Sequence, residues 1–322
     1  MRVKIIKVLS LFNGISCGRI ALERANIPVE RYVSYEIDKY ANKVSKANYP
    51  DDEYNGDVFD ADFTKYKGFD LLIGGSPCTN WSIAKNGRET TPNGIGWELF
   101  LQFKRALVES GCKWFLYENN HSIHKDIKTA ITNELDVEPI MINSALVSAQ
   151  NRRREYWTNI PNVVQPEDKG IFIKDILESG YVGDINKAYV LTATCGNSVP
   201  QDMIKSKRTQ VFKPVRIGDI STSKAKGQSG RVYSINGKSV CLSANGGGGG
   251  AKTGLYKIDL TDGDYIIRKL FIEECCRLQT IPSSYFIDAS GEKIVFDTQA
   301  YKGIGNGWTV DVIAWILSFI QL

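Results

Sequence analysis

The first 120 residues alternate between short apolar runs and amphipathic runs, and this alternation restricts the fold more than any other feature. Apolar, β-prone runs occupy residues 3–12, 31–36, 69–74 and 113–119. Runs with helical spacing lie between them, at residues 17–25, 38–47 and 98–110. Because strands that alternate with helices form parallel sheets covered on both faces, we predict a doubly wound, mostly parallel α/β lobe.

The pattern changes after about residue 165, where Gly, Ser and Lys become frequent and the β-prone runs become short. We predict a smaller domain of strands and loops at 181–265, including the glycine-rich loop 243–254. Helical patterns return at 267–279 and 309–320, and the second is apolar on nearly all sides, as in a core helix. The predicted organisation is a main domain (1–180 with 300–322), the small domain, and a hinge with a connecting helix (266–299).

The charge is unevenly distributed along the chain. The net charge is +4, but residues 201–240 contain nine Lys and Arg against two Asp, so the rest of the chain carries a net negative charge. A local excess of positive charge on a nearly neutral chain is typical of a lobe that faces a polyanion. A solvated surface is the alternative that composition alone leaves open.

The cysteines and histidines exclude several kinds of site. The seven cysteines include no C-x-x-C pair, which argues against a disulfide framework and a structural zinc site. His121 and His124 are the two histidines, so the chain has few residues for a His-based metal site or a Ser-His-Asp triad. No apolar stretch is long enough to cross a membrane, and the first residues lack a signal-peptide pattern, so we predict a cytosolic protein without membrane contact.

Two turns carry candidate chemistry. The segment GGSPCTNWS (74–82) follows an apolar run and presents Cys78 on a Gly- and Pro-rich turn, which favours a nucleophile over a buried structural thiol. The Gly-rich turn LSLFNGISCG (9–18) follows the first predicted strand, as in nucleotide-binding α/β domains. Glu36 and Asp57 end or precede later strands, where carboxylates bind ribose or adenine, although each alone could be a helix cap.

Six segments together resemble the motifs of DNA (cytosine-5) methyltransferases of the bacterial or phage modification type, and they occur in that family's order. They are LFNGISCG (11–18), GGSPCTNWS (74–82), ENN (118–120), QNRRR (150–154), RKLFIEECCRLQTIP (268–282) and AYKGIGNGWTVDVI (300–313). The resemblance implies a Rossmann-like methyltransferase fold with a target-recognition domain. It also implies S-adenosyl-L-methionine as the cofactor and double-stranded DNA as the partner of a monomer, in the cytoplasm of a bacterial or phage-infected cell.

The resemblance assigns roles to individual residues. Cys78 would add to C6 of cytosine, Glu118 would act as the acid at N3, and Arg154 and Arg152 would hold the base and the catalytic loop. The cofactor residues would be Phe12, Asn13, Gly14, Glu36, Asp57, Pro77, Leu99 and Asn306.

The DNA contacts are expected in two places. A loop at 79–97 would close on a flipped cytosine, with Ser82, Lys85 and Arg88 at the backbone. In the small domain Arg231, assisted by Gln228, would read bases, and the other basic side chains would contact phosphates.

Four positions depart from the family's pattern, namely Ser10, Thr79, Asn120 and Trp308. Each is a supporting position, so we expect an active enzyme with altered cofactor or loop contacts. Two alternatives stay open: an RNA cytosine methyltransferase that uses the same cysteine, and a non-catalytic DNA-binding protein that retains the fold.

Overall fold

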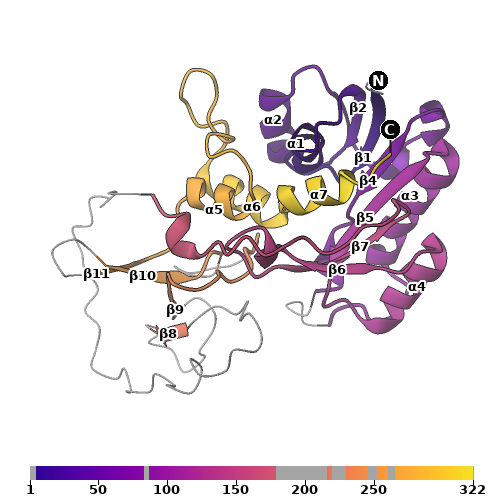
Figure 1. The fold of residues 1–322 in the computed structure, drawn as a ribbon. Helices are drawn as coiled ribbons and strands as arrows, with labels where there is room; N and C mark the ends of the chain where they lie inside the picture. Colours follow the sequence, from indigo (N-terminus) through magenta and orange to yellow (C-terminus); the bar gives the residue numbers. More distant parts are fainter. Residues whose placement is uncertain are drawn as a thin grey trace.

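A seven-stranded sheet forms the centre of the main lobe in the computed structural model, which describes residues 5–82, 87–178, 216–219, 230–244, 252–259 and 265–321 (Figure 1). The strand order is β3-β2-β1-β4-β5-β7-β6. The strands are β1 (Ile6–Leu11), β2 (Val29–Tyr35), β3 (Glu53–Asn55), β4 (Leu71–Gly74), β5 (Trp114–Asn120), β6 (Ile140–Asn143) and β7 (Arg153–Thr158). Parallel pairing joins β3 through β5, and β7 is antiparallel to both neighbours. The predicted doubly wound, mostly parallel α/β fold is confirmed.

Helices cover both faces of this sheet because successive strand residues point to opposite sides. Val8 and Leu116 enter one apolar layer, whereas Leu9 and Tyr117 enter the other. The first layer contains α1 (Cys17–Arg24), α2 (Lys39–Asn48), α5 (Ile272–Leu278), α6 (Asp297–Asn306) and α7 (Val310–Leu317). The second contains α3 (Ile95–Ser110) and α4 (Lys125–Leu135).

The last helix, α7, packs in the core as its composition predicts. Val310, Val312, Ile313, Ile316 and Leu317 are fully buried, and α7 lies against α1 although the two helices belong to opposite ends of the chain. Residues of α6 and α7 and residues of the first strands therefore share one core. None of the helices in the described ranges is long and apolar enough to span a membrane.

A second, four-stranded sheet forms the small lobe (Figure 1), in the order β11-β10-β9-β8. Its strands are β8 (Arg216–Asp219), β9 (Arg231–Ser234), β10 (Leu255–Asp259) and β11 (Tyr265–Arg268). The last strand of this sheet ends at Arg268. The small lobe is joined to the main lobe through Ser239, whose N–H donates to the Ala149 carbonyl at 2.6 Å and whose carbonyl accepts from Asn151 N at 3.1 Å.

Several elements differ from the predictions for local reasons. The helix predicted over 267–279 forms only from Ile272 onward, because Tyr265–Arg268 pair with β10 instead. Helix α3 begins at Ile95, earlier than predicted, and its N-cap is Gly94, with a positive φ of 80°. The predictions did not include α4, β6 and α6, which have polar or short sequences with weak periodicity.

Candidate active site

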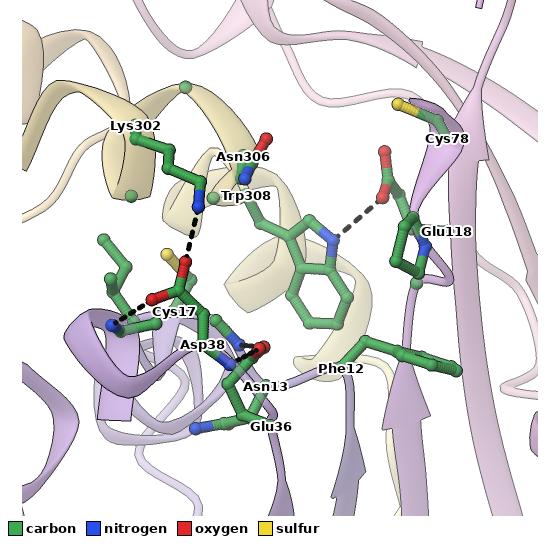
Figure 2. A pocket seen from close by; sticks show the side chains of 18 of the residues that line it. Phe12, Asn13, Cys17, Glu36, Asp38, Cys78, Glu118, Lys302, Asn306 and Trp308 are labelled. Carbon is green, nitrogen blue, oxygen red and sulfur yellow. Dashed lines mark hydrogen bonds and ion pairs between the residues drawn. The ribbon is translucent and has the colours of Figure 1, made fainter. Parts of the chain in front are cut away.

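A cavity of about 320 Å³ opens at the carboxyl ends of the central parallel strands (Figure 2). Its lining combines residues that follow β1, β2 and β4, residues of β5 and β7, and the turn between α6 and α7. Open α/β sheets bind ligands at this edge because the loops leave the sheet there in opposite directions. The location therefore makes this cavity the candidate site for both a cofactor and a reacting base.

Cys78 lies in this cavity at the start of a 3₁₀ turn (η3, Cys78–Asn80) that follows β4. Gly74 and Gly75, which lie just before this turn, have no room for a side chain. A Cβ on Gly74 would lie 2.8 Å from the Leu11 carbonyl oxygen, and one on Gly75 would lie 2.9 Å from Glu118 Oε2. The turn can approach β1 and β5 this closely only without side chains, and this places the thiol beside Glu118.

The thiol of Cys78 is surrounded by charges of both signs. Burial raises the pKa of Cys78; the positive charge of Arg154 opposes this effect, and the negative charge of Glu118 adds to it. The thiol therefore prefers the protonated state in this conformation. A thiolate, which is the nucleophilic form, becomes more stable when the Glu118 charge is neutralised or when a cation moves closer.

Glu118 lies on β5 and both of its carboxylate oxygens have a partner; Figure 2 shows the partner from Trp308. Arg154 Nε, from β7, is 2.9 Å from Oε1. The indole N–H of Trp308 donates to Oε2 at 2.9 Å. Glu118 and Arg154 are both buried, so this ion pair is shielded from water and held in one arrangement.

Arg152 is also buried but contacts a different part of the molecule. Its Nη2 donates to the Gly307 carbonyl at 2.9 Å, and its Nη1 lies 3.3 Å from the Gly305 carbonyl. The same Nη1 lies 3.4 Å from Sγ of Cys241, which comes from the small lobe. Arg152 therefore joins the turn after α6 to the small lobe, while Arg154 is the arginine that meets Glu118.

The predicted cofactor residues divide into two groups. Those that line the cavity are Phe12, Asn13, Gly14, Glu36, Pro77 and Asn306, whereas Asp57 and Leu99 do not. Asp57 is exposed and caps a 3₁₀ turn by accepting from Phe59 N at 3.0 Å. This is the helix-cap role that the sequence offered as the alternative to adenine binding. Leu99 is on α3 and packs partly against the second apolar layer.

Glu36 follows β2 and its carboxylate is held by backbone donors. Oε2 accepts from Gly14 N at 2.8 Å and Oε1 accepts from Asp38 N at 2.8 Å. Burial raises the pKa of Glu36, and these backbone N–H groups oppose the rise. The carboxylate is thus fixed at the cavity wall (Figure 2), where it could accept hydrogen bonds from a ribose.

Three residues in or beside the cavity were missed by the sequence reasoning or given no role in it. Lys302 on α6 pairs with Asp38, the N-cap of α2, at 2.7 Å (Figure 2). Cys241 directly precedes the LSANGGG segment but has no motif of its own. Trp308 is predicted only as a departure from a motif. A role for Trp308 could have been suspected from its indole N–H, because this donor needs a hydrogen-bond partner when a tryptophan is partly buried.

The catalytic-loop candidates lie only partly within the described residues, and Lys85 lies outside them. Ser82 is partly buried beside Cys78, where its N–H donates to the Cys78 carbonyl at 2.9 Å. Arg88 donates to the Ser122 carbonyl at 2.8 Å, which ties this loop to the turn after β5. Neither Ser82 nor Arg88 lines the cavity.

The small-lobe candidates are Gln228, which lies outside the described residues, and Arg231, which is partly buried on β9 opposite Asp219. The expectation that the remaining basic residues of this lobe face phosphates is wrong for Lys238. Lys238 is 3% exposed, and its ammonium donates to the carbonyls of Ala145, Ser148 and Ile171 at 2.6–3.2 Å. Its charge anchors the small lobe to the main lobe.

Comparisons with known proteins identify the family of the chain. The family model of the C-5 cytosine-specific DNA methylases matches residues 6–321. The chain is 29% identical to the type II methyltransferase M.HhaI of Haemophilus parahaemolyticus, over 97% of this chain and 93% of that protein. It is 29% identical to the orphan methyltransferase M.SPRI of Bacillus phage SPR, over 76% of this chain and 65% of that protein.

The fold is also found in a solved structure. The methyltransferase EhMeth of Entamoeba histolytica superimposes with a TM-score of 0.67, with 18% identity over 98% of both chains. At this identity the likeness concerns the fold. The family model spans nearly the whole sequence, and the chain therefore belongs to the C-5 cytosine-specific DNA methylase family.

Proposed function

We propose that this chain transfers a methyl group from S-adenosyl-L-methionine to C5 of cytosine in double-stranded DNA, in a sequence-specific manner. The observation that carries the proposal is the convergence of Cys78, Glu118 and Arg154 in one cavity. The same cavity holds Glu36 and the turn after β1. A nucleophile, an acid and a cation thus share a wall with a nucleotide-type pocket.

The residues fit the cofactor by their chemistry. Phe12 and Ile37 offer apolar surface, and the Glu36 carboxylate offers an acceptor for ribose hydroxyls. Phe12, with a φ of 55°, and Gly14, with a φ of 57°, form the tight turn that brings the backbone of β1 to the cavity. S-adenosyl-L-methionine supplies an electrophilic methyl group when it is bound.

The proposed chemistry begins with Cys78, because C5 of cytosine is a weak nucleophile. The thiolate adds to C6, and the electron pair of the C5–C6 double bond becomes available at C5. Glu118, in its protonated form, donates to N3 and limits the negative charge on the ring, while Arg154 stabilises the charge that remains. After C5 takes the methyl group, a base removes the C5 proton, and the thiolate leaves C6 as the double bond re-forms.

A cytosine in a duplex cannot reach Cys78, so the base must leave the helix stack. Unpairing and unstacking cost a few kcal/mol, which contacts to the protein must supply. The loop after Cys78, with Ser82, Lys85 and Arg88, is the proposed site of backbone contacts. Arg231 and Gln228 of the small lobe are the proposed readers of the target sequence.

A methyl-transfer assay with tritiated S-adenosyl-L-methionine tests the proposal. Duplex DNA and transfer RNA are compared as acceptors under the same conditions. Label in duplex DNA is the expected result, and bisulfite sequencing of DNA from cells that express the chain then identifies the target. Label in RNA alone would support the RNA methyltransferase, and DNA binding without any transfer would support the non-catalytic protein.

A further inference from the structure

Trp308 occupies an unusual place between the cofactor pocket and the candidate acid. Its indole lines the cavity, and its N–H donates to Glu118 Oε2 at 2.9 Å (Figure 2). The opposite oxygen, Oε1, faces Arg154 Nε at 2.9 Å. Among the described residues each carboxylate oxygen therefore has one donor, and the two donors come from different parts of the chain.

The ring is seated in a slot that glycines leave open. A Cβ on Gly75 would lie 3.4 Å from Trp308 Nε1 and 2.9 Å from Glu118 Oε2. On the other side, a Cβ on Gly18 would lie 3.4 Å from Trp308 Cζ3 and 2.4 Å from Ile73 Cδ1. The closeness of both backbones restricts the indole to a narrow range of orientations.

The backbone on both sides of Trp308 is also fixed. The Gly307 carbonyl accepts from Arg152 Nη2 at 2.9 Å and from Gln279 Nε2 at 3.1 Å. The buried Thr309 hydroxyl donates to Gln279 Oε1 at 2.7 Å. Because the Gly307 carbonyl and the buried Thr309 hydroxyl are both hydrogen-bonded, the indole N–H is held in place before any substrate arrives.

We propose that Trp308 is a positioning residue for Glu118. The indole N–H fixes the carboxyl plane so that Glu118 faces the base while Arg154 stays paired with Oε1 of Glu118. This inference rests on the proposed function, in which Glu118 is the acid. A neutral donor suits this role because it holds the oxygen without adding a second charge to the one that Arg154 supplies.

The test separates the N–H from the ring. In Trp308→Phe the ring still lines the cavity but the donor is lost, so kcat should fall about ten-fold, as for one hydrogen bond to a charged group. The KM for S-adenosyl-L-methionine should change less than about two-fold, since an aromatic ring still lines the proposed cofactor pocket. Trp308→Ala removes both the N–H donor and the ring, so it should lower kcat and raise the KM for S-adenosyl-L-methionine.

Trp315→Phe is the matched control, because Trp315 Nε1 donates to the Val164 carbonyl at 2.7 Å on the surface, away from the cavity. It should retain wild-type kcat and KM. Unmethylated genomic DNA serves as the acceptor, and thermal melting of each variant confirms folding.

Three results would overturn the inference while the proposed function stands: unchanged kcat in Trp308→Phe, a raised cofactor KM with unchanged kcat, or equal losses in Trp315→Phe. A wild-type protein that labels no DNA would instead refute the proposed function, and the role of Trp308 with it.

Discussion

The Sγ atom of Cys241 lies 3.4 Å from Nη1 of Arg152, so a thiol of the small lobe contacts an arginine of the main lobe. Arg154 Nη2 lies 3.9 Å from the same sulfur. Burial would raise the pKa of Cys241, but the charges of Arg152 and Arg154 more than offset it and lower the pKa. Two thiols thus share these arginines, and Cys241 is the more acidic of the two.

Cys241→Val should lower the pKa of Cys78, because the charge of Cys241 is one of the influences that raise it. The rate at which iodoacetamide alkylates Cys78, followed by peptide mass spectrometry against pH, should rise at a lower pH in the variant than in the wild type. The control is Cys112→Ser, which removes a buried thiol that accepts a hydrogen bond from Ser110 and is not among the largest influences on the pKa of Cys78. An unchanged or higher midpoint for Cys78 would show that the two thiols do not interact.

Alanine at Gly74 or Gly75 should have distinct effects. At Gly74 the new Cβ meets the Leu11 carbonyl, so Gly74→Ala should destabilise the fold by about 1–3 kcal/mol in urea unfolding. At Gly75 the new Cβ meets the backbone carbonyl and the carboxylate of Glu118, so Gly75→Ala should destabilise the fold and also lower kcat. The control is Gly56→Ala, because a Cβ at Gly56 would have no atom within 4 Å. Full activity of Gly75→Ala would disprove the close approach.

Glu36→Gln should weaken the binding of S-adenosyl-L-methionine about ten-fold in calorimetry, since an ionised acceptor at the cavity wall is lost. The control is Glu53→Gln, which removes an exposed carboxylate that pairs with Arg31 on the neighbouring strand. Equal affinities for wild type and Glu36→Gln would place the cofactor elsewhere.

Lys238→Met should destabilise the protein by about 3 kcal/mol, because two buried carbonyl groups and one partly buried carbonyl group lose their donor. The salt dependence of DNA binding should stay unchanged, since a buried ammonium releases no counterions from phosphate. Lys257→Met, at a more exposed ion pair, should leave stability within about 0.5 kcal/mol. A smaller salt slope in Lys238→Met would mean that Lys238 reaches DNA.

The positions of Cys78, Glu36 and Glu118 could be predicted from the sequence because each lies at the end of an apolar run or on the turn after it. The carboxyl ends of parallel strands meet at one edge of the sheet, so residues there converge whatever their distance along the chain. The nearly all-apolar composition of residues 309–320 predicts a core helix, and α7 is indeed buried, where it packs against α1.

The partners Trp308 and Cys241 could not be predicted in this way. Trp308 lies 190 residues after Glu118, and their hydrogen bond depends on how α6 and α7 pack on the sheet. The burial of Lys238 depends likewise on the docking of the small lobe, and composition alone places a lysine on the surface. Such contacts arise from tertiary packing, which leaves no local pattern in the sequence.

The central claim is that Cys78 is the nucleophile of a DNA cytosine methyltransferase. Its most direct test is tritium transfer from labelled S-adenosyl-L-methionine to duplex DNA by the wild type and by Cys78→Ser. We predict label in DNA with the wild type and none above background with the variant, although calorimetry still shows that the variant binds the cofactor. Equal transfer by both proteins would contradict the claim.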